Sequence, residues 1–385
     1  MNYNPAMPSI ADMAAKARKR IPAFAVDYLE SGIGGEFCLR RNRGDLDNVI
    51  LWPRYLCDVG TVNTHCRLFD HDYDLGIGVS PVGLGNMMWP NGESRLARAA
   101  QAANIPYIYS TMGTTALEDI AANAPDVGWF QLYVPRDRAI MRDLIERAGR
   151  AGFKALVVTV DIPVGAKRDR ELKNGLILPF RITPRLVAQV IRRPLWALLT
   201  LRHGMPRFMN LMPYSDSGDI KHLGEFLTQF FCPGVSIERL QEIRSLWQGP
   251  LIIKGLQRGS DISAAADLGA DGVILSNHAG RQLDAAPSSI AALQALPSSL
   301  RERMTVMLDS GIRSGLDVVR ARALGASAVF SGRSFMYALA AAGADGPRQA
   351  IEIFRDEITR TLQQLGCTEF EAMSADYRLQ TTDNR

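Results

Sequence analysis

Closely spaced cysteines and long apolar runs are missing from this sequence, and each absence excludes a class of protein. The five cysteines show no Cys-x-x-Cys spacing, so the sequence predicts neither a disulfide framework nor a metal site and favours a reducing cytoplasmic compartment. No uninterrupted apolar run reaches the roughly 18 residues that a membrane-spanning helix needs. The N-terminus also lacks the apolar segment of a secretory leader, so we expect no Sec-dependent export.

A strong net charge and a dinucleotide fingerprint are absent too. The net charge is only +4, which argues against a general nucleic-acid-binding protein. No Gly-x-Gly-x-x-Gly motif follows an apolar run, which argues against an open dinucleotide-binding sheet. The composition, 47% hydrophobic and 22% charged, is that of a globular protein, and 385 residues allow two domains or one large barrel with insertions.

Short apolar runs alternate with amphipathic stretches from residue 75 onwards. Most of these runs start about 21–33 residues apart, which is the size of a β-α repeat. Eight such units favour a closed (β/α)8 TIM barrel, an α/β fold, over an open doubly wound sheet. The expected strands are residues 75–79, 105–110, 128–134, 155–161, 251–255, 272–278, 305–311 and 328–333.

Expected helices flank the repeat at both ends. Residues 9–20, with Ser9 as N-cap, and residues 24–31 and 40–49 predict an N-terminal helical extension. Residues 349–365 predict a final helix packed on the outside. We therefore predict a single domain over residues 1–385, with a long insertion at about residues 172–232 after the fourth strand.

Polar residues gather where the expected strands end. The carboxyl ends of the strands carry the active site in this type of barrel. Buried Lys, Asp and Arg are costly unless they are paired, so the agreement of six strands indicates a site rather than packing. These residues are Gln131, Tyr133, Thr159, Asp161, Lys254, His278, Arg281, Asp309, Gly311, Arg313, Gly332 and Arg333.

The stretch Ser276-Asn277-His278-Ala279-Gly280-Arg281-Gln282-Leu283-Asp284 combines a proton acceptor with an anion ligand. A histidine titrates near neutral pH, and an arginine binds a carboxylate through two parallel hydrogen bonds. We pair Asp161 with His278, because a carboxylate fixes the tautomer of a catalytic histidine. The alternative interpretation is an ordinary loop histidine beside a surface arginine.

The seventh and eighth strands end in Gly-Ile-Arg and Ser-Gly-Arg, which is typical of a phosphate site in this barrel. Small residues expose backbone N–H groups there, and Arg313 and Arg333 add positive charge. Together with Lys254, which stabilises negative charge on a reduced ring, this arrangement suits flavin mononucleotide (FMN). The alternative is a pair of arginines in ordinary surface loops.

Residues 276–284 closely resemble the signature of the FMN-dependent 2-hydroxy acid dehydrogenase and oxidase family. This family includes L-lactate dehydrogenase, mandelate dehydrogenase and glycolate oxidase. Further segments match in the family's order between about residues 21 and 379, namely residues 131–133, 159–161, 251–255 and 308–313. The resemblance implies oxidation of an (S)-2-hydroxy acid, L-lactate-like or larger, to the 2-oxo acid, and a homotetramer.

The resemblance also implies roles for individual residues. His278 is the expected catalytic base and Asp161 its partner; Tyr133, Arg168 and Arg281 bind the substrate. The expected FMN contacts are Pro81, Val82 and Gly83 beside flavin N5, Ser110, Gln131, Thr159 and Ser276 near the ring, Lys254 at the N1 edge, and Asp309, Gly311, Arg313, Gly332 and Arg333 along the ribityl phosphate.

Three positions depart from the family pattern. Ala279 replaces the usual glycine, which is a minor change if its φ is negative. Val26 stands where we expect a carboxylate-binding tyrosine, and a valine cannot donate a hydrogen bond. Met112 replaces the large aromatic of glycolate oxidase. The changes at Val26 and Met112 both predict a more open substrate pocket.

The insertion is basic and apolar at once. Residues 172–215 contain no acidic residue but seven Lys and Arg, interleaved with leucines and Trp196. This pattern predicts two short helices separated at Pro194. We expect them to lie on the anionic inner face of the cell membrane, with a quinone as electron acceptor. The alternative role of this segment is a lid over the barrel mouth. The alternative to a quinone-dependent enzyme is an oxidase that uses O2 and makes H2O2, for which the small Gly83 leaves room. The alternative to an enzyme is a binding protein whose activity has lapsed.

Overall fold

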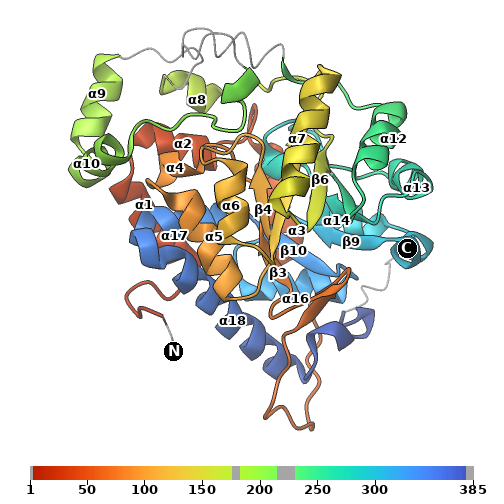
Figure 1. Cartoon of the computed structure of the whole chain (residues 1–385). Coiled ribbons are helices and arrows are strands. Elements are labelled where there is room, and N and C mark those ends of the chain that lie inside the picture. The colour runs from red at the N-terminus through yellow and green to blue at the C-terminus, as the bar shows by residue number, and fades with distance from the viewer. Residues whose placement is uncertain (1–2, 176–182, 215–229, 379–385) are drawn as a thin grey trace.

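The computed structural model describes residues 3–175, 183–214 and 230–378 (Figure 1). In this part of the chain, eight parallel strands close into a barrel in the order β10-β3-β4-β5-β6-β7-β8-β9. The predicted (β/α)8 TIM barrel is therefore confirmed. The barrel strands are β3 (Ile77–Val79), β4 (Tyr107–Ser110), β5 (Gly128–Tyr133), β6 (Ala155–Thr159), β7 (Leu251–Lys254), β8 (Gly272–Leu275), β9 (Thr305–Leu308) and β10 (Ala328–Ser331).

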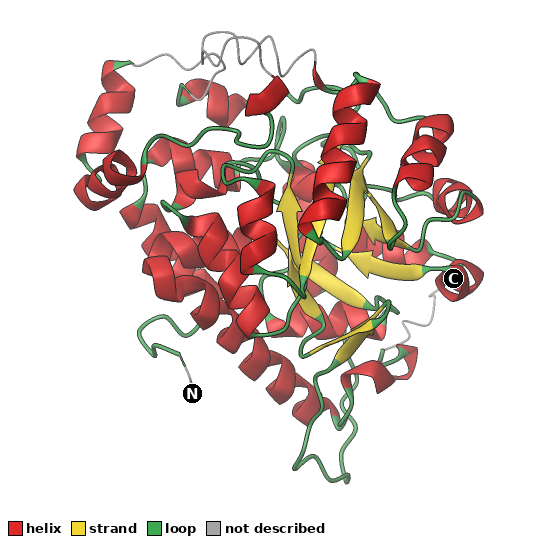
Figure 2. Cartoon of the chain, in the orientation of Figure 1, coloured by secondary structure: helices red, strands yellow, loops and turns green. Residues whose placement is uncertain are grey.

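The barrel strands are buried on both faces because helices surround them (Figure 2). Parallel strands covered on both sides read as continuous apolar runs, and that pattern located all eight of them. Several strands end two or three residues earlier than we predicted: β6 ends at Thr159, β8 at Leu275 and β9 at Leu308. The chain leaves the ladder at these points and turns its polar side chains into the site.

Helices follow most strands at the expected positions. The predicted helix over residues 138–151 coincides with α7, where Asp137 caps the first turn and Gly152 ends the helix with φ 89°. Three further helices, α4, α12 and α15, were not predicted. The helices that accompany the barrel are α4 (Gly85–Met88), α5 (Gly92–Ala102), α6 (Leu117–Asn123), α7 (Arg138–Ala151), α12 (Ile237–Leu246), α13 (Gly259–Asp267), α14 (Ser289–Ala295), α15 (Ser298–Arg303), α16 (Gly315–Ala323), α17 (Arg333–Ala342) and α18 (Gly346–Leu365), with short 3-10 turns η3 (Gly343–Asp345), η4 (Phe370–Ala372) and η5 (Ala375–Tyr377).

The predicted N-terminal extension is present as α1 (Ile10–Arg20), α2 (Ala23–Glu30) and α3 (Phe37–Asp47). Ser9 begins α1 through a capping box with Asp12, as its sequence position indicated. The extension reaches the carboxyl end of the barrel: the side-chain amides of Asn42 on α3 and Asn277, just after β8, exchange two hydrogen bonds of 2.9 and 2.7 Å. This pair ties the extension to the loop that carries His278.

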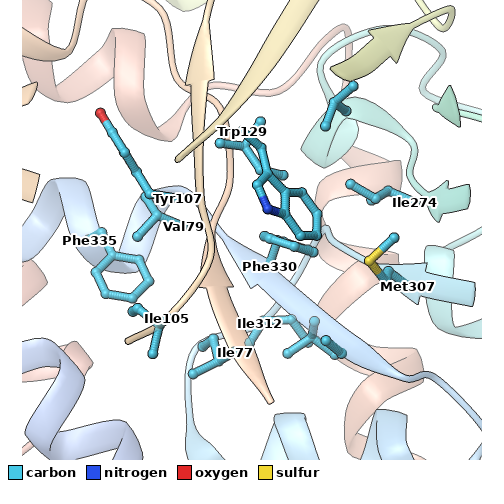
Figure 3. Close-up of a cluster of buried hydrophobic side chains, with 14 of the residues drawn as sticks. Ile77, Val79, Ile105, Tyr107, Trp129, Ile274, Met307, Ile312, Phe330 and Phe335 are labelled. Carbon is cyan, nitrogen blue, oxygen red and sulfur yellow. The ribbon is translucent and has the colours of Figure 1, made fainter. Parts of the chain in front are cut away.

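Aromatic side chains close the amino-terminal end of the barrel. The indole of Trp129 packs against Phe330 at 5.6 Å between ring centroids (Figure 3). The indole N–H also donates a hydrogen bond to the Tyr73 hydroxyl. Tyr73 and Phe69 come from an antiparallel hairpin of β1 (Cys66–Leu68) and β2 (His71–Tyr73). With this end plugged, access to the barrel is left to the opposite end.

The insertion contains α8 (Asp169–Lys173), α9 (Pro184–Ile191), α10 (Pro194–His203) and the 3-10 turn η1 (Met212–Tyr214). Two short helices separated at Pro194 were predicted, and α9 and α10 confirm them; residues 181–182 of the predicted segment lie outside the described residues. Helices α9 and α10 lie together at one side of the molecule (Figure 1). Trp196, which we expected to insert into a membrane, is instead buried, with its ring against Phe24 and its indole N–H on the Met87 carbonyl. This residue therefore attaches α10 to the protein.

Candidate functional site

A cavity of about 640 Å³ opens at the carboxyl ends of the barrel strands. Its wall includes fifteen of the residues that we expected at the site: Pro81, Val82, Gly83, Met112, Tyr133, Thr159, Arg168, Lys254, His278, Arg281, Asp309, Gly311, Arg313, Gly332 and Arg333. Asp161, Ser110, Gln131 and Ser276 do not line the cavity but bond to residues that do or to one another, as described below. Val26 does neither.

His278 and Asp161 form a hydrogen-bonded pair, as the sequence predicted. Nδ1 of His278 lies 3.0 Å from Oδ1 of Asp161, and Nε2 lies 3.4 Å from the Tyr133 hydroxyl. Burial lowers the pKa of His278, and the charges of Lys254 and Arg168 act in the same direction, while Asp161 opposes them. The imidazole is therefore neutral near pH 7, with Nδ1 protonated toward Asp161 and an acceptor lone pair on Nε2 beside the Tyr133 hydroxyl.

The backbone of the histidine loop is left-handed over three consecutive residues. His278, Ala279 and Gly280, which form the 3-10 turn η2, have φ values of 55°, 57° and 73°. Asn277 stabilises this turn because its side chain accepts a hydrogen bond from the Gly280 N–H at 3.1 Å. We expected alanine at position 279 to be a minor change only for a negative φ; the φ of 57° does not meet this condition, and glycine adopts this region with less strain than alanine.

Lys254 is a buried cation between two polar partners. Its Nζ lies 3.1 Å from Oδ2 of Asp309 and donates a hydrogen bond of 2.9 Å to Ser276. Burial alone would lower the pKa of this lysine, but Asp309 and Asp161 outweigh that effect and the pKa is raised. A permanent positive charge therefore faces the cavity at the end of β7.

Three neighbouring strands carry a chain of polar side chains behind the cavity wall. The Ser110 hydroxyl donates to Gln131 at 2.8 Å, and the Gln131 amide donates to the Thr159 hydroxyl at 2.9 Å. Only Thr159 among them lines the cavity. Ser110 and Gln131 thus orient Thr159 from behind.

Two arginines that follow β9 and β10 line the cavity; Arg333 is buried and Arg313 is half-buried. Within the described residues, neither guanidinium group has a carboxylate within ion-pair distance, and those of Arg313 and Arg333 donate to backbone carbonyls. Burial lowers the pKa of Arg333 to about 9, and Arg313 and Arg281 add to the effect. A Cβ at Gly332 would lie 2.9 Å from Val82, so glycine keeps this corner open. Two desolvated guanidinium groups beside open backbone fit the phosphate of FMN.

A second cationic cluster lies beside this pair, because Arg281 and Arg333 donate to the same carbonyl, that of Ser31. Nη1 of Arg281 donates to the carbonyls of Tyr28 and Ser31, and its guanidinium lies over the Tyr28 ring at 5.1 Å. Arg168 donates to Glu171, while its buried Nε has no hydrogen-bond partner among the residues that the structure describes. An unsatisfied buried donor beside a second arginine fits a carboxylate that completes the cluster.

Val26 is not the residue of α2 that reaches this corner. Tyr28 lines the cavity, and its hydroxyl donates to the Gly83 carbonyl at 3.0 Å. Two residues on a helix are separated by about 200° around the axis, so Val26 and Tyr28 point in nearly opposite directions. Val26 itself does not line the cavity, and the effect of its missing hydroxyl on carboxylate binding stays a prediction.

Sequence reasoning missed several other residues of the cavity wall. Glu171 had a detectable signal, since it stands three residues after Arg168 on a helix, where opposite charges meet. Phe208 and Phe231 come from the insertion and its end, and no sequence pattern tied them to the barrel. Among the described residues, no cluster of three His, Cys, Asp or Glu side chains is placed to hold a metal ion.

Comparison with known proteins agrees with this site. A family model described as FMN-dependent dehydrogenase matches residues 17–380. The chain is 39% identical over 368 residues to an L-lactate dehydrogenase of Pseudomonas paraeruginosa, covering 95% of this chain and 96% of that protein. It superposes on a crystal structure of the monotopic membrane protein (S)-mandelate dehydrogenase with a TM-score of 0.92 at 34% identity, covering 96% of this chain and 98% of the other. A mandelate oxidase structure matches with a TM-score of 0.79 at 35% identity, covering 95% and 97%. The chain therefore belongs to the family of FMN-dependent dehydrogenases, with FMN as its cofactor.

Proposed function

We propose that this enzyme oxidises an (S)-2-hydroxy acid, L-lactate-like or larger, to the 2-oxo acid. The observation that carries the proposal is the arrangement of a neutral histidine, with its partner Asp161, opposite two arginines in one cavity. Bound FMN supplies the two-electron acceptor. The relatives named L-lactate dehydrogenase and (S)-mandelate dehydrogenase support this substrate class.

In the proposed reaction, Nε2 of His278 takes a proton from the substrate. Asp161 remains ionised, because His278 and Lys254 lower the pKa of its carboxyl against the effect of burial, and it stabilises the imidazolium that forms. Burial raises the pKa of Tyr133, so its hydroxyl stays protonated and donates a hydrogen bond to the substrate oxygen. The positive Lys254 stabilises negative charge that develops in the cavity.

The arginine cluster fixes the orientation of the substrate. Arg281 and Arg168 bind the substrate carboxylate, which leaves the carbon-bound hydroxyl toward His278 and Tyr133. The remaining wall near this corner is apolar, with Met112, Phe208 and Phe231. A side chain larger than the methyl group of lactate would remove this apolar surface from water, which favours the larger members of the substrate class.

We propose further that the enzyme lies on the inner face of the cell membrane and passes its electrons to a quinone. None of the described helices is long and apolar enough to cross a membrane. Helices α9 and α10 expose Ile191, Leu195, Leu198 and Leu201 by 53–81%, beside exposed Arg192 and Arg202, which is the composition of a segment that binds an anionic surface. Arg193 does not contribute, because it donates to the carbonyls of Ile21 and Arg18. The similarity to a monotopic membrane enzyme supports the same location.

The alternative electron acceptor is oxygen, which would make the protein an oxidase. The similarity to a mandelate oxidase supports this alternative. Gly83, which leaves room for oxygen, does not favour it specifically: a Cβ at this position would lie 2.9 Å from Cβ of Met112, so a larger residue would force Met112 to shift, and packing is a sufficient reason for glycine. We also expect the whole chain, residues 1–385 with its insertion at 172–232, to act as one domain and to assemble as a tetramer, which mass photometry of the intact enzyme would test.

Anaerobic mixing with 2-hydroxy acids tests the proposed reaction. We expect an (S)-2-hydroxy acid such as L-lactate or (S)-mandelate to bleach the flavin, and the (R)-enantiomer to do so far more slowly. The bleached enzyme is then offered a short-chain quinone or oxygen in separate experiments. Faster reoxidation by quinone supports the dehydrogenase, whereas faster reoxidation by oxygen with H2O2 production would select the oxidase. No bleaching by any 2-hydroxy acid would overturn the proposal.

A further inference from the structure

A carboxylate of the chain itself lies among the cations at the substrate end of the cavity. Glu171 is on α8, at the beginning of the insertion, and its side chain is only 12% exposed. Its Oε1 accepts hydrogen bonds from Arg281 at 2.9 Å, from Arg168 at 3.2 Å and from the Ser31 hydroxyl at 2.8 Å. Glu171 is not required for proton transfer at His278 or for phosphate binding by Arg313 and Arg333. Its presence in the cavity therefore needs a separate explanation.

The position of Glu171 matters because it joins two guanidinium groups that repel each other. The pKa of Arg281 is lowered first by burial and next by the charge of Arg168, and Glu171 opposes both effects. Opposite charges attract strongly at this distance when water is excluded, so Glu171 holds the two arginines together. A donor remains for a ligand, since the buried Nε of Arg168 has no partner within the described part of the chain.

The net charge of the cluster of Arg168, Arg281 and Glu171 is +1. Arg168 and Arg281 contribute two positive charges, and Glu171 contributes one negative charge. Arg333, which donates to the same Ser31 carbonyl as Arg281, is assigned to the phosphate of FMN, so in the FMN-loaded enzyme the cluster is complementary to a single carboxylate. We propose, building on the function proposed above, that Glu171 is a specificity-determining residue: it neutralises one arginine and thereby selects substrates with one carboxylate over substrates with two. Without it, the same corner would carry two positive charges and favour a dianion.

Two small anions of nearly identical shape test the inference. Oxamate carries one negative charge and oxalate carries two, and the binding of each is followed by its perturbation of the flavin absorbance in the FMN-loaded enzyme. Glu171→Gln keeps the size and the hydrogen-bond acceptor but removes the charge. We expect it to raise the affinity for oxalate relative to oxamate by at least ~10-fold over wild type, a modest part of what a unit charge exerts at contact distance. Glu171→Asp, which retains the charge, keeps the wild-type ratio.

A matched control separates charge from the attachment of α8. Arg170 ties the same helix to Asp27 at 2.6 Å and to Glu36 at 3.5 Å, without reaching the two arginines. Arg170→Gln therefore loosens α8 while leaving Glu171 in the chain, and its ratio of the two affinities should not rise. An unchanged ratio in Glu171→Gln, or an equal rise in Arg170→Gln, would overturn the inference, as would wild-type enzyme that binds neither anion. These measurements need no turnover, so they are independent of whether a 2-hydroxy acid bleaches the flavin.

Discussion

Replacing Leu198 and Leu201 on α10 by glutamine should release the enzyme from membranes. Their side chains are 64% and 81% exposed, so the changes leave the core intact, and glutamine has nearly the helix propensity of leucine. Full burial of a leucine is worth about 1.5–3 kcal/mol. Scaled by the exposed fractions, the two substitutions cost about 2–4 kcal/mol of membrane transfer free energy. The partition coefficient should therefore fall roughly 30- to 1000-fold.

Sedimentation with vesicles that contain anionic lipid measures this change directly. Leu56→Gln is the matched control, because Leu56 is fully exposed at 107% on a loop between α3 and β1, outside the insertion. Wild type and the control should sediment with the vesicles, more weakly at high salt because the arginines also contribute. If the double variant binds as well as wild type, or if Leu56→Gln loses as much, then the α9–α10 surface is not the membrane contact and its lid interpretation gains support.

Three further predictions concern the cavity. His278 acts as a base only when it is neutral, which is above its pKa, and burial lowers that pKa. The rate of flavin reduction should therefore fall on acidification with a midpoint below the ordinary ~6.5 of histidine. A pH series of single-turnover reactions measures this midpoint. Tyr28→Phe should weaken substrate binding about 2- to 10-fold, which corresponds to the loss of one neutral hydrogen bond. Val26→Tyr should leave the apparent dissociation constant of the substrate unchanged. Tighter binding by Val26→Tyr would contradict the assignment of the substrate end of the cavity to Tyr28. Arg333→Met should weaken FMN binding at least ~10-fold in fluorescence titrations of the apoprotein, with a smaller loss for Arg333→Lys, because charge-assisted hydrogen bonds are worth about 1.5–3 kcal/mol.

The barrel and most of its cavity wall could be predicted because the responsible signals are local. Each strand is a short apolar run that ends at a polar residue, and the closure of the barrel then brings those ends together. His278 and Asp161 are 117 residues apart, yet their contact followed from being at the ends of two barrel strands. The helix α12 was missed, although Ser236 caps it and Ile237, Leu240 and Ile243 recur at helical spacing, because it follows directly on the insertion.

What failed was the direction in which helical side chains point. Val26 was assigned to the site where Tyr28 on the same helix occupies it, because one sequence does not show which face of a helix turns to the barrel. Trp196 was expected on the outer face of α10 for the same reason, yet it is 4% exposed. The φ of Ala279 could not be predicted either, since it is imposed by the cap from Asn277 and by the contact of Gly280 with α3.

The rate of flavin reduction in His278→Gln tests the central claim most directly. Glutamine is uncharged and polar, so FMN should stay bound, which the visible spectrum of the variant reports before mixing. Anaerobic stopped-flow mixing with the (S)-2-hydroxy acid that bleaches wild type should then show reduction slowed by at least ~10²-fold, the low end for removal of a general base. Reduction of the FMN-loaded variant at close to the wild-type rate would contradict the account, because Nε2 of His278 could not then be the proton acceptor.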